Sequence, residues 1–505
     1  MNFQTTTRPL SQIQTDLLIV PLFEDAKELE PKAKELNRAL GEEISDLISR
    51  GDFKPKLAET QAMFTGKRTA AKRVLLLGLG KQSEYNLEKA RTAMSAAAPV
   101  AQKFKVNDIA IALIKTLPSK VSVESATQAL TEGILLANYK FTEYKKRGEE
   151  EKPAALTQIQ FVLSNSRDKT KVLKAATVAH TLSQAANYAR DLGNHPGNVA
   201  TPQHLAKHAL DLAKQHSKIL KAKVLGKGDL QKESMGAVLA VAQGSDEEPK
   251  FIVLEYHAEK KAPTVVLAGK GITFDSGGIS IKPSEKMEEM KYDMAGGATV
   301  LATIKAACEL RLPINLVGLI PATENLPSGK AIKPGDIVRS RAGLTIEVVN
   351  TDAEGRMVLA DALDYAKKYK PVLVIDFATL TGAIVVALGD DLIGAFTNQE
   401  RLVPQLKNAA QITGEQIWLM PLYKEYEQFI KSDFADLRNV GAVPRQGDAV
   451  NAALFLQNFV SYPWIHLDIA GVAWTTREKP YRPKGATGVG VRLALEFLKN
   501  FKHRR

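Results

Sequence analysis

Apolar residues in the first third of the chain form short, uninterrupted runs, and the segments between them repeat apolar positions with helical spacing. Uninterrupted runs are typical of strands buried on both faces, and they occur at residues 17–22, 74–79, 109–113 and 159–163. The amphipathic segments predict helices at about residues 31–49 and 88–103. Strands that alternate with helices in this way indicate an α/β domain.

The rest of the chain repeats this alternation after a long helical pattern at about residues 169–192. Strand-like runs are centred near these residues: Ile252, Val265, Leu316, Ile346, Val374 and Ile465. Because helical segments separate the runs, we expect a mixed, largely parallel sheet flanked by helices on both faces. The sequence therefore predicts an α/β protein of two domains, a smaller N-terminal α/β domain at 1–166 and a C-terminal α/β domain at 193–505, joined by a connecting helix at 167–192.

Carboxylates concentrate where two of the predicted strands end. The run 350–356 places Asp352 and Glu354 directly after one strand. Upstream, Asp275 and Asp293 follow another strand, and open α/β sheets bind ligands at the carboxyl ends of their strands. Four neighbouring carboxylates repel one another unless cations neutralise them, so we expect a site for divalent cations such as Mg²⁺, Mn²⁺ or Zn²⁺.

Purely structural interpretations compete with this one. Asp352 and Glu354 alone would serve equally well as a helix cap, and Arg356 would then pair with Glu354 in the first helical turn. Lys282 alone would be a solvated surface charge. The second acidic cluster favours the metal site, because a helix cap does not require it.

Histidine offers no competing site in the sequence. His204 and His208, four residues apart on a predicted helix, are interpreted as a polar helix face. The chain contains no His-Glu-x-x-His sequence, which excludes a thermolysin-like zinc site.

Several segments resemble blocks of the leucyl aminopeptidases, the cytosol aminopeptidase family of two-metal exopeptidases. In chain order these segments are residues 270–278, 290–296, 324–329, 334–336, 350–356 and 378–383. The resemblance runs from about Asn194 to Arg492, whereas the first 165 residues resemble the family far less, as its variable N-terminal domain would. It implies that residues 193–505 form a metallopeptidase catalytic domain.

The resemblance implies a set of metal ligands: Lys270, Asp275, Asp293, Asp352 and Glu354. In the family's arrangement, Lys270 and Asp293 hold only the tighter ion. Asp352 holds only the exchangeable ion, with its backbone carbonyl assisting, and Asp275 and Glu354 bridge the two. The expected cofactors are therefore two divalent ions per subunit, Mn²⁺ or Zn²⁺.

The resemblance also implies catalytic and substrate-binding residues. Lys282 would polarise the scissile carbonyl and stabilise the oxyanion, and Arg356 would hold a bicarbonate that acts as general base. The expected pocket for the first substrate side chain is lined by Met290, Thr379, Leu380 and Gly382, which by default are core and turn residues. Residues 443–452 depart from the Gly/Ala/Thr-rich helix start that family members more often have near this pocket.

The expected activity is that of a metal-dependent aminopeptidase, a hydrolase that removes leucine and other apolar residues from short peptides with a free N-terminus. Two metal ions in such a site activate a water and anchor the free α-amine of the substrate. The family assembles as a homohexamer with active sites facing an inner cavity, and the resemblance implies the same assembly here.

Composition limits the number of domains, the cellular compartment and the membrane association that we expect for this protein. At 505 residues and 45% hydrophobic content, the chain is long enough for two or three domains with their own cores. Cys308 is the only cysteine, which fits a reducing compartment. The sequence has neither a secretory signal nor an apolar run approaching the roughly 20 residues of a membrane span, so we expect a cytoplasmic protein without a membrane partner.

A net charge of +12 raises a second hypothesis, the binding of nucleic acid or another polyanion. The basic segments are not interleaved with aromatic residues, which make up only 6% of the chain, so this role would be secondary to peptidase activity. A two-metal phosphoesterase is a third hypothesis. The lysine ligand and the missing histidine ligands argue against it.

Overall fold

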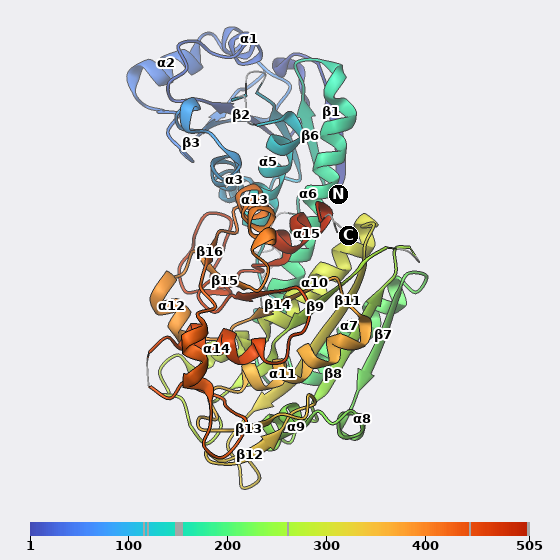
Figure 1. The fold of residues 1–505 in the computed structure, drawn as a ribbon. Coiled ribbons are helices and arrows are strands. Elements are labelled where there is room, and N and C mark those ends of the chain that lie inside the picture. Colours follow the sequence, from blue (N-terminus) through green and yellow to red (C-terminus); the bar gives the residue numbers. More distant parts are fainter. Residues whose placement is uncertain (115–116, 119–120, 147–154, 260–261, 444–445, 502–505) are drawn as a thin grey trace. The chain divides into compact units, whose positions relative to one another are not determined.

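The computed structural model describes residues 1–505 except 115–116, 119–120, 147–154, 260–261, 444–445 and 502–505. The chain divides into two compact units, Met1–Gln184 with Arg477–Pro483 and Ala185–Thr476 with Lys484–Arg505. Each unit has an α/β structure built on its own sheet (Figure 1). The long helical pattern forms one continuous helix, α6 (Lys169–Asn194). The division between the two units falls within this helix.

The first unit is a six-stranded sheet in the order β1-β6-β5-β2-β4-β3, parallel except at its edge strand β3. Its strands are β1 (Asn2–Thr6), β2 (Leu17–Leu22), β3 (Thr60–Phe64), β4 (Arg73–Gly78), β5 (Asp108–Ala112) and β6 (Gln158–Val162). Its helices, besides the first part of α6, are α1 (Pro31–Ala39), α2 (Glu43–Arg50), α3 (Leu87–Ser95), α4 (Ala97–Lys103) and α5 (Val123–Ala137).

Successive residues of β2 enter two different cores, which explains its uninterrupted apolar pattern. Leu17 and Ile19 pack with residues of α3, α4 and α5, whereas Leu18 and Val20 pack with residues of α1 and α2. The sheet is therefore buried on both faces, as the sequence predicted for this unit.

Two predicted helices are each divided in the structure. Gly41 and Glu42 adopt φ angles of 72° and 67°, which end α1 and begin α2 within the segment predicted as one helix. Ala96 separates α3 from α4 without a positive φ angle, since its backbone stays in the right-handed helical region. The sequence did not predict β1 and β3, which are edge strands with mostly half-exposed residues and lack a continuous apolar run.

The main sheet of the second unit has nine strands, in the order β16-β15-β18-β14-β9-β11-β8-β7 with β10 also pairing to β11. Its strands are β7 (Leu220–Leu225), β8 (Lys250–Tyr256), β9 (Thr264–Gly269), β10 (Gly271–Asp275), β11 (Asn315–Asn325), β14 (Leu373–Ala378), β15 (Ile393–Thr397), β16 (Ile417–Leu419) and β18 (Trp464–Asp468). The central strands are parallel, and β7, β8 and β15 introduce antiparallel pairs. The predicted mixed, largely parallel sheet is thus confirmed.

One predicted strand belongs elsewhere. Ile346 lies in β13 (Thr345–Glu347), which pairs with β12 (Ile337–Arg339) and β17 (Leu437–Arg438) in a separate three-stranded sheet. A further two-stranded sheet joins β19 (Trp474–Thr475) and β20 (Gly485–Ala486). An apolar pattern alone does not specify which neighbour a strand pairs with.

Helices cover both faces of the main sheet. Besides the end of α6, they are α7 (Pro202–Gln215), α8 (Lys227–Lys232), α9 (Gly236–Ala242), α10 (Ala295–Leu310), α11 (Gly355–Ala366), α12 (Gly382–Leu388), α13 (Val403–Thr413), α14 (Asp448–Gln457) and α15 (Val491–Lys499). Val317 and Leu319 of β11 enter the core shared with α9, α11 and α14. Between them, Gly318 faces α10, where an added Cβ would lie 2.5 Å from Ile304.

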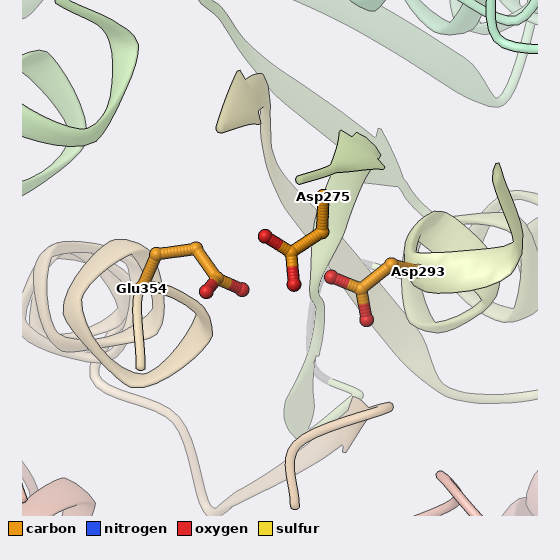
Figure 2. A group of neighbouring side chains, drawn as sticks. All are labelled: Asp275, Asp293 and Glu354. Atoms are coloured by element: carbon orange, nitrogen blue, oxygen red, sulfur yellow. The ribbon is translucent and has the colours of Figure 1, made fainter. Parts of the chain in front are cut away.

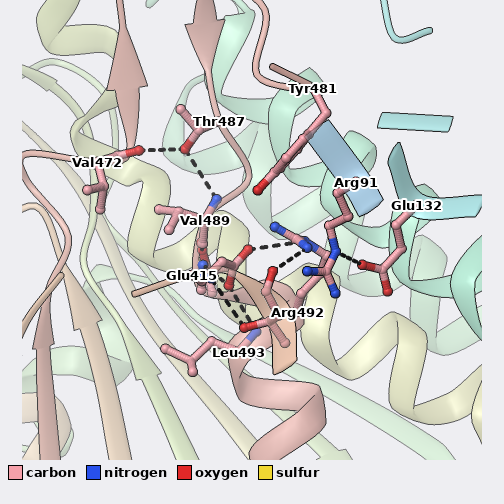
Figure 3. Close-up of polar contacts among 12 residues, drawn as sticks. Arg91, Glu132, Glu415, Val472, Tyr481, Thr487, Val489, Arg492 and Leu493 are labelled. Carbon is pink, nitrogen blue, oxygen red and sulfur yellow. Dashed lines mark hydrogen bonds and ion pairs between the residues drawn. The ribbon is translucent and has the colours of Figure 1, made fainter. Parts of the chain in front are cut away.

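A polar network holds the C-terminal helix of the second unit in place. The Glu415 carboxylate accepts hydrogen bonds from the backbone N–H groups of Gly490, at 3.0 Å, and Leu493, at 2.9 Å (Figure 3). It thereby satisfies donors at the start of α15 that have no partner within the helix.

Among the helices that the structure describes, none is long and apolar enough to cross a membrane.

Candidate metal centre

Four of the predicted ligands come from two strands of the main sheet and from two helical segments beside them. Lys270 directly follows β9, Asp275 ends β10, and Glu354 immediately precedes α11. Asp293 lies in a 3₁₀ helix (Met287–Met294) that leads into α10. All four side chains are buried, and Figure 2 shows the carboxylates of Asp275, Asp293 and Glu354 pointing toward a common space.

The three buried carboxylates are close enough to bind one ion together. One oxygen from each of Asp275, Asp293 and Glu354 lies within 4.8 Å of the others. The Lys270 Nζ atom lies 2.7 Å from Asp293 Oδ2 and 2.9 Å from Glu354 Oε1, and it also donates to the Thr379 carbonyl at 3.0 Å. The structure therefore brings these predicted residues together with their polar atoms facing inward.

Lys282 and Asp352 form the more open side of the cluster. The Lys282 Nζ atom lies 2.8 Å from Asp275 Oδ2 and 2.5 Å from Asp352 Oδ1. The Lys282 and Asp352 side chains are 21% and 31% exposed, compared with 4% for Lys270. The Lys282 side of the cluster is therefore the more exposed one, whereas Lys270 is enclosed.

The electrostatics of the cluster favour binding of cations. Burial and repulsion from Glu354 raise the pKa of Asp275 to about 6. Burial also raises the pKa of Asp293 well above its usual value, although Lys270 opposes the shift. Four carboxylates face only two ammonium groups here, and dications neutralise such an excess without protonation. The oxygen-rich donor set fits Mn²⁺, Mg²⁺ or Zn²⁺.

Two polar residues fix the orientation of the carboxylates. The Asn325 amide donates to Asp275 Oδ1 at 2.9 Å and to the Thr351 carbonyl at 3.0 Å. The Thr379 hydroxyl donates to Asp293 Oδ1 at 2.6 Å. Sequence reasoning assigned no role to Asn325, although the parallel pairing of β10 with β11 places it directly beside Asp275.

Arg356 lies in the first turn of α11 and is buried. Its Nη1 donates to the Asn439 carbonyl at 2.8 Å, while its buried Nε atom has no hydrogen-bond partner among the described residues. Burial lowers the pKa of Arg356, and the carboxylates of Asp448 and Glu354 counteract this effect. A buried guanidinium with an unused donor is suited to hold a small planar anion.

The predicted pocket residues lie on two segments near the centre. Met290 is half-buried in the 3₁₀ helix that carries Asp293. Thr379, Leu380 and Gly382 lie where β14 turns into α12, and the Leu380 N–H donates to Asp468 Oδ1 at 3.1 Å. Of the departing segment 443–452, residues 444–445 lie outside the described residues, and α14 begins at Asp448.

Known proteins resemble the whole chain. The model of the cytosol aminopeptidase family's catalytic domain matches residues 187–495, and that of its N-terminal domain matches residues 19–148. The probable cytosol aminopeptidase of Geobacter sp. (strain M21) is 44% identical over 487 residues, which are 96% of this chain and 97% of the relative. The probable cytosol aminopeptidase of Roseiflexus castenholzii is 44% identical over an alignment of 506 positions, which covers 98% of this chain and 98% of the relative.

Solved structures agree with these matches. A mutant of tomato leucine aminopeptidase superimposes with a TM-score of 0.89 at 32% identity, covering 99% of this chain and 97% of that one. The bottromycin maturation enzyme BotP in complex with Mn gives a TM-score of 0.84 at 32% identity, covering 96% and 99%.

The fold and the buried acidic cluster define a metal-dependent peptidase. The chain belongs to the cytosol aminopeptidase family, and it is a metal-dependent aminopeptidase. The expected enzyme class is thereby confirmed, and the family membership decides against the phosphoesterase hypothesis.

Proposed function

We propose that this enzyme removes N-terminal leucine and other apolar residues from short peptides, using two divalent cations held by Lys270, Asp275, Asp293, Asp352 and Glu354. The observation that carries the proposal is the convergence of three buried carboxylates within 4.8 Å, with a lysine on each side. When bound, two dications lower the pKa of a shared water and polarise the scissile carbonyl.

The two lysines have different proposed roles because their surroundings differ. Lys270 is enclosed between Asp293, Glu354 and the Thr379 carbonyl, and as a ligand it gives up its proton, because only the neutral amine has a lone pair to donate. Burial opposes the charge of each lysine, but the neighbouring carboxylates outweigh that effect and raise the pKa of both Lys270 and Lys282. Lys282, which lies on the more exposed side and is not a proposed ligand, keeps its charge. Its partly exposed ammonium group is placed to stabilise the oxyanion of the substrate.

Arg356 is the proposed holder of a bicarbonate that accepts a proton from the attacking water. Its anchored Nη1 and its unpartnered buried Nε support this role. Arg356 would hold this anion beside α11, because the Asn439 carbonyl fixes its guanidinium there.

The substrate class follows from the charge of the centre. A free peptide N-terminus is attracted to a carboxylate-rich site, and its neutral amine can serve as a ligand that positions the scissile bond. The pocket for the first side chain of the substrate has a proposed lining of Met290, Thr379, Leu380 and Gly382.

For the metal, Mn²⁺ and Zn²⁺ are both candidates, and the structural neighbour BotP has been determined in complex with Mn.

We further propose a cytoplasmic homohexamer, as the family resemblance implies. The second unit exposes large apolar side chains, among them Val386, Trp418 and Phe434, which fit contact surfaces between copies of the chain. Nucleic-acid binding by the basic surface remains a secondary proposal, carried only by the net charge of +12.

The decisive experiment measures hydrolysis of leucine p-nitroanilide by metal-stripped enzyme, with each dication added back separately. We expect no turnover without metal and recovery with Mn²⁺ or Zn²⁺, and glutamate p-nitroanilide should be a poorer substrate than the leucine compound. Full turnover by protein that elemental analysis shows to be metal-free would refute the mechanism. Analytical ultracentrifugation of the same sample measures the mass of the assembly in solution and so tests the proposed hexamer.

A further inference from the structure

Three histidines gather in the second unit outside the carboxylate centre. His204 and His208 lie one turn apart on α7, and His195 follows the end of α6. The His204 and His208 rings turn toward each other, with their Nε2 atoms 3.1 Å apart. The His195 ring lies edge-on to that of His204, with ring centroids 5.3 Å apart. The two α7 residues, which the sequence assigned to a polar helix face, thus have rings that contact each other.

At least one of the two facing rings is neutral in this arrangement. Two Nε2 atoms at hydrogen-bond distance share one proton, so one donates and the other accepts. The hydroxyl of Tyr188 lies 3.0 Å from Nδ1 of His208 and fixes the orientation of that ring. Burial, followed by the neighbouring His204 and His195, lowers the pKa of His208 to about 4, and burial lowers that of His204 in the same direction. Neutral imidazole is the form that binds metal ions.

The spacing of the facing nitrogens matches that of two ligands on one ion. Tetrahedral Zn²⁺ with Zn–N bonds of about 2.0–2.1 Å places two ligand nitrogens about 3.3 Å apart. The observed 3.1 Å therefore needs a change of only a few tenths of an ångström. The Tyr188 hydroxyl contacts Nδ1 of His208, the ring nitrogen that faces away from His204. Histidine ligands of metals usually have such a hydrogen-bond partner on their other ring nitrogen.

The surroundings permit an ion to enter and to be partly neutralised. The three histidines are half-buried rather than enclosed. Asp211, one turn after His208 on α7, favours positive charge at His208, while Lys207 disfavours it. A purely structural hydrogen-bonded pair would explain the contact of His204 with His208, but it would not require His195 at their side.

We propose that His204 and His208, completed by His195, form a binding site for one imidazole-preferring dication such as Zn²⁺, separate from the carboxylate centre. The two sites select different ions: nitrogen ligands favour Zn²⁺ or Cu²⁺, whereas the carboxylate cluster also accepts Mn²⁺ and Mg²⁺. The His195 ring lies edge-on beside His204, and its side chain would have to move for one of its nitrogens to join the pair as a ligand.

The test compares total bound Zn²⁺ in the full-length wild-type enzyme and in a His204→Gln/His208→Gln double variant, dialysed against the same buffered free Zn²⁺. Elemental analysis should find one equivalent fewer per chain in the variant, whatever the occupancy of the carboxylate centre. The matched control is His216→Gln, at the end of the same helix, which should bind as much as wild type. Equal Zn²⁺ content in the double variant and the wild type would overturn the proposal.

Two further measurements keep the proposal testable if the double variant does not fold. Tyr188→Phe leaves all three rings in place but removes the hydroxyl beside His208, and it should weaken Zn²⁺ binding at this site about tenfold or more. Electron paramagnetic resonance of wild-type protein with one equivalent of Cu²⁺ should show hyperfine coupling to at least two nitrogens. A spectrum without coupling to nitrogen, as expected for Cu²⁺ bound by oxygen ligands alone, would contradict the proposed site.

Discussion

Asn325 provides a sharp test of how the metal centre is organised, because it contacts the centre only through hydrogen bonds. Replacing it with alanine removes donors to Asp275 Oδ1, at 2.9 Å, and to the Thr351 carbonyl, at 3.0 Å, together with a longer hydrogen bond of 3.4 Å to Glu354 Oε2. All three acceptors are buried, and loss of a partner for a buried charged group costs about 1–3 kcal/mol. Groups that orient metal ligands typically contribute about 10- to 100-fold to metal affinity, or roughly 1.4–2.8 kcal/mol.

We therefore expect Asn325→Ala to bind Mn²⁺ about 10- to 100-fold more weakly than wild type while it still folds. Competition with a chelating indicator measures the dissociation constant, and thermal unfolding of the metal-free protein measures the separate loss of stability. The matched control is Asn315→Ala at the other end of β11, whose amide donates to the loop carbonyls of Glu259 and Ala262 and accepts from the backbone N–H groups of Ala258 and Glu259.

The control separates metal binding from general stability. Asn315→Ala should lower the melting temperature without changing Mn²⁺ affinity, since its hydrogen bonds lie far along the strand from Asp275. If Asn325→Ala binds Mn²⁺ within twofold of wild type, Asp275 does not depend on this amide for its orientation. The same conclusion would follow if both variants lost affinity equally, because the effect would then be one of stability.

Three further outcomes test the proposed roles. Lys282→Ala should retain its metal by elemental analysis yet lose at least about 100-fold in kcat, as removal of an oxyanion donor does elsewhere; parallel loss of metal would make Lys282 a ligand. Glu354→Ala should lose metal and activity together, because it removes a ligand from both ions, and full metal content would refute the bridging role. Leucine amide should be cleaved more than tenfold faster than N-acetyl-leucine amide, since a blocked amine cannot position the substrate; similar rates would exclude amine anchoring.

The interior strands could be predicted from the sequence because a sheet buried on both faces demands continuous apolar runs, as β2 shows. Edge strand β1 could not, because its half-exposed residues carry no such pattern and only pairing with β6 makes it a strand. The assignment of Ile346 to a separate sheet was equally inaccessible, since pairing partners are decided by tertiary contacts.

The acidic cluster was predictable for a different reason. Asp275, Asp293 and Glu354 are carboxylates in two short acidic segments that each follow an apolar run, and such a concentration of charge is conspicuous in the sequence. Asn325 and the ring pair of His204 and His208 are ordinary polar residues by sequence. Their contacts depend on the register of β10 with β11 and on the orientation of side chains on α7, neither of which a residue pattern specifies.

Gly355 links the sequence motif of residues 350–356 to the geometry of the centre. A Cβ atom at this position would lie 2.4 Å from Lys270 Cε and 2.7 Å from Lys270 Nζ, closer than side-chain atoms can approach. Lys270 therefore reaches Asp293 and Glu354 only because the helix that begins after Glu354 presents no side chain there. The glycine thus allows the lysine that follows β9 and the glutamate that precedes α11 to meet, which explains why an acidic pair and a glycine occur together in one short segment.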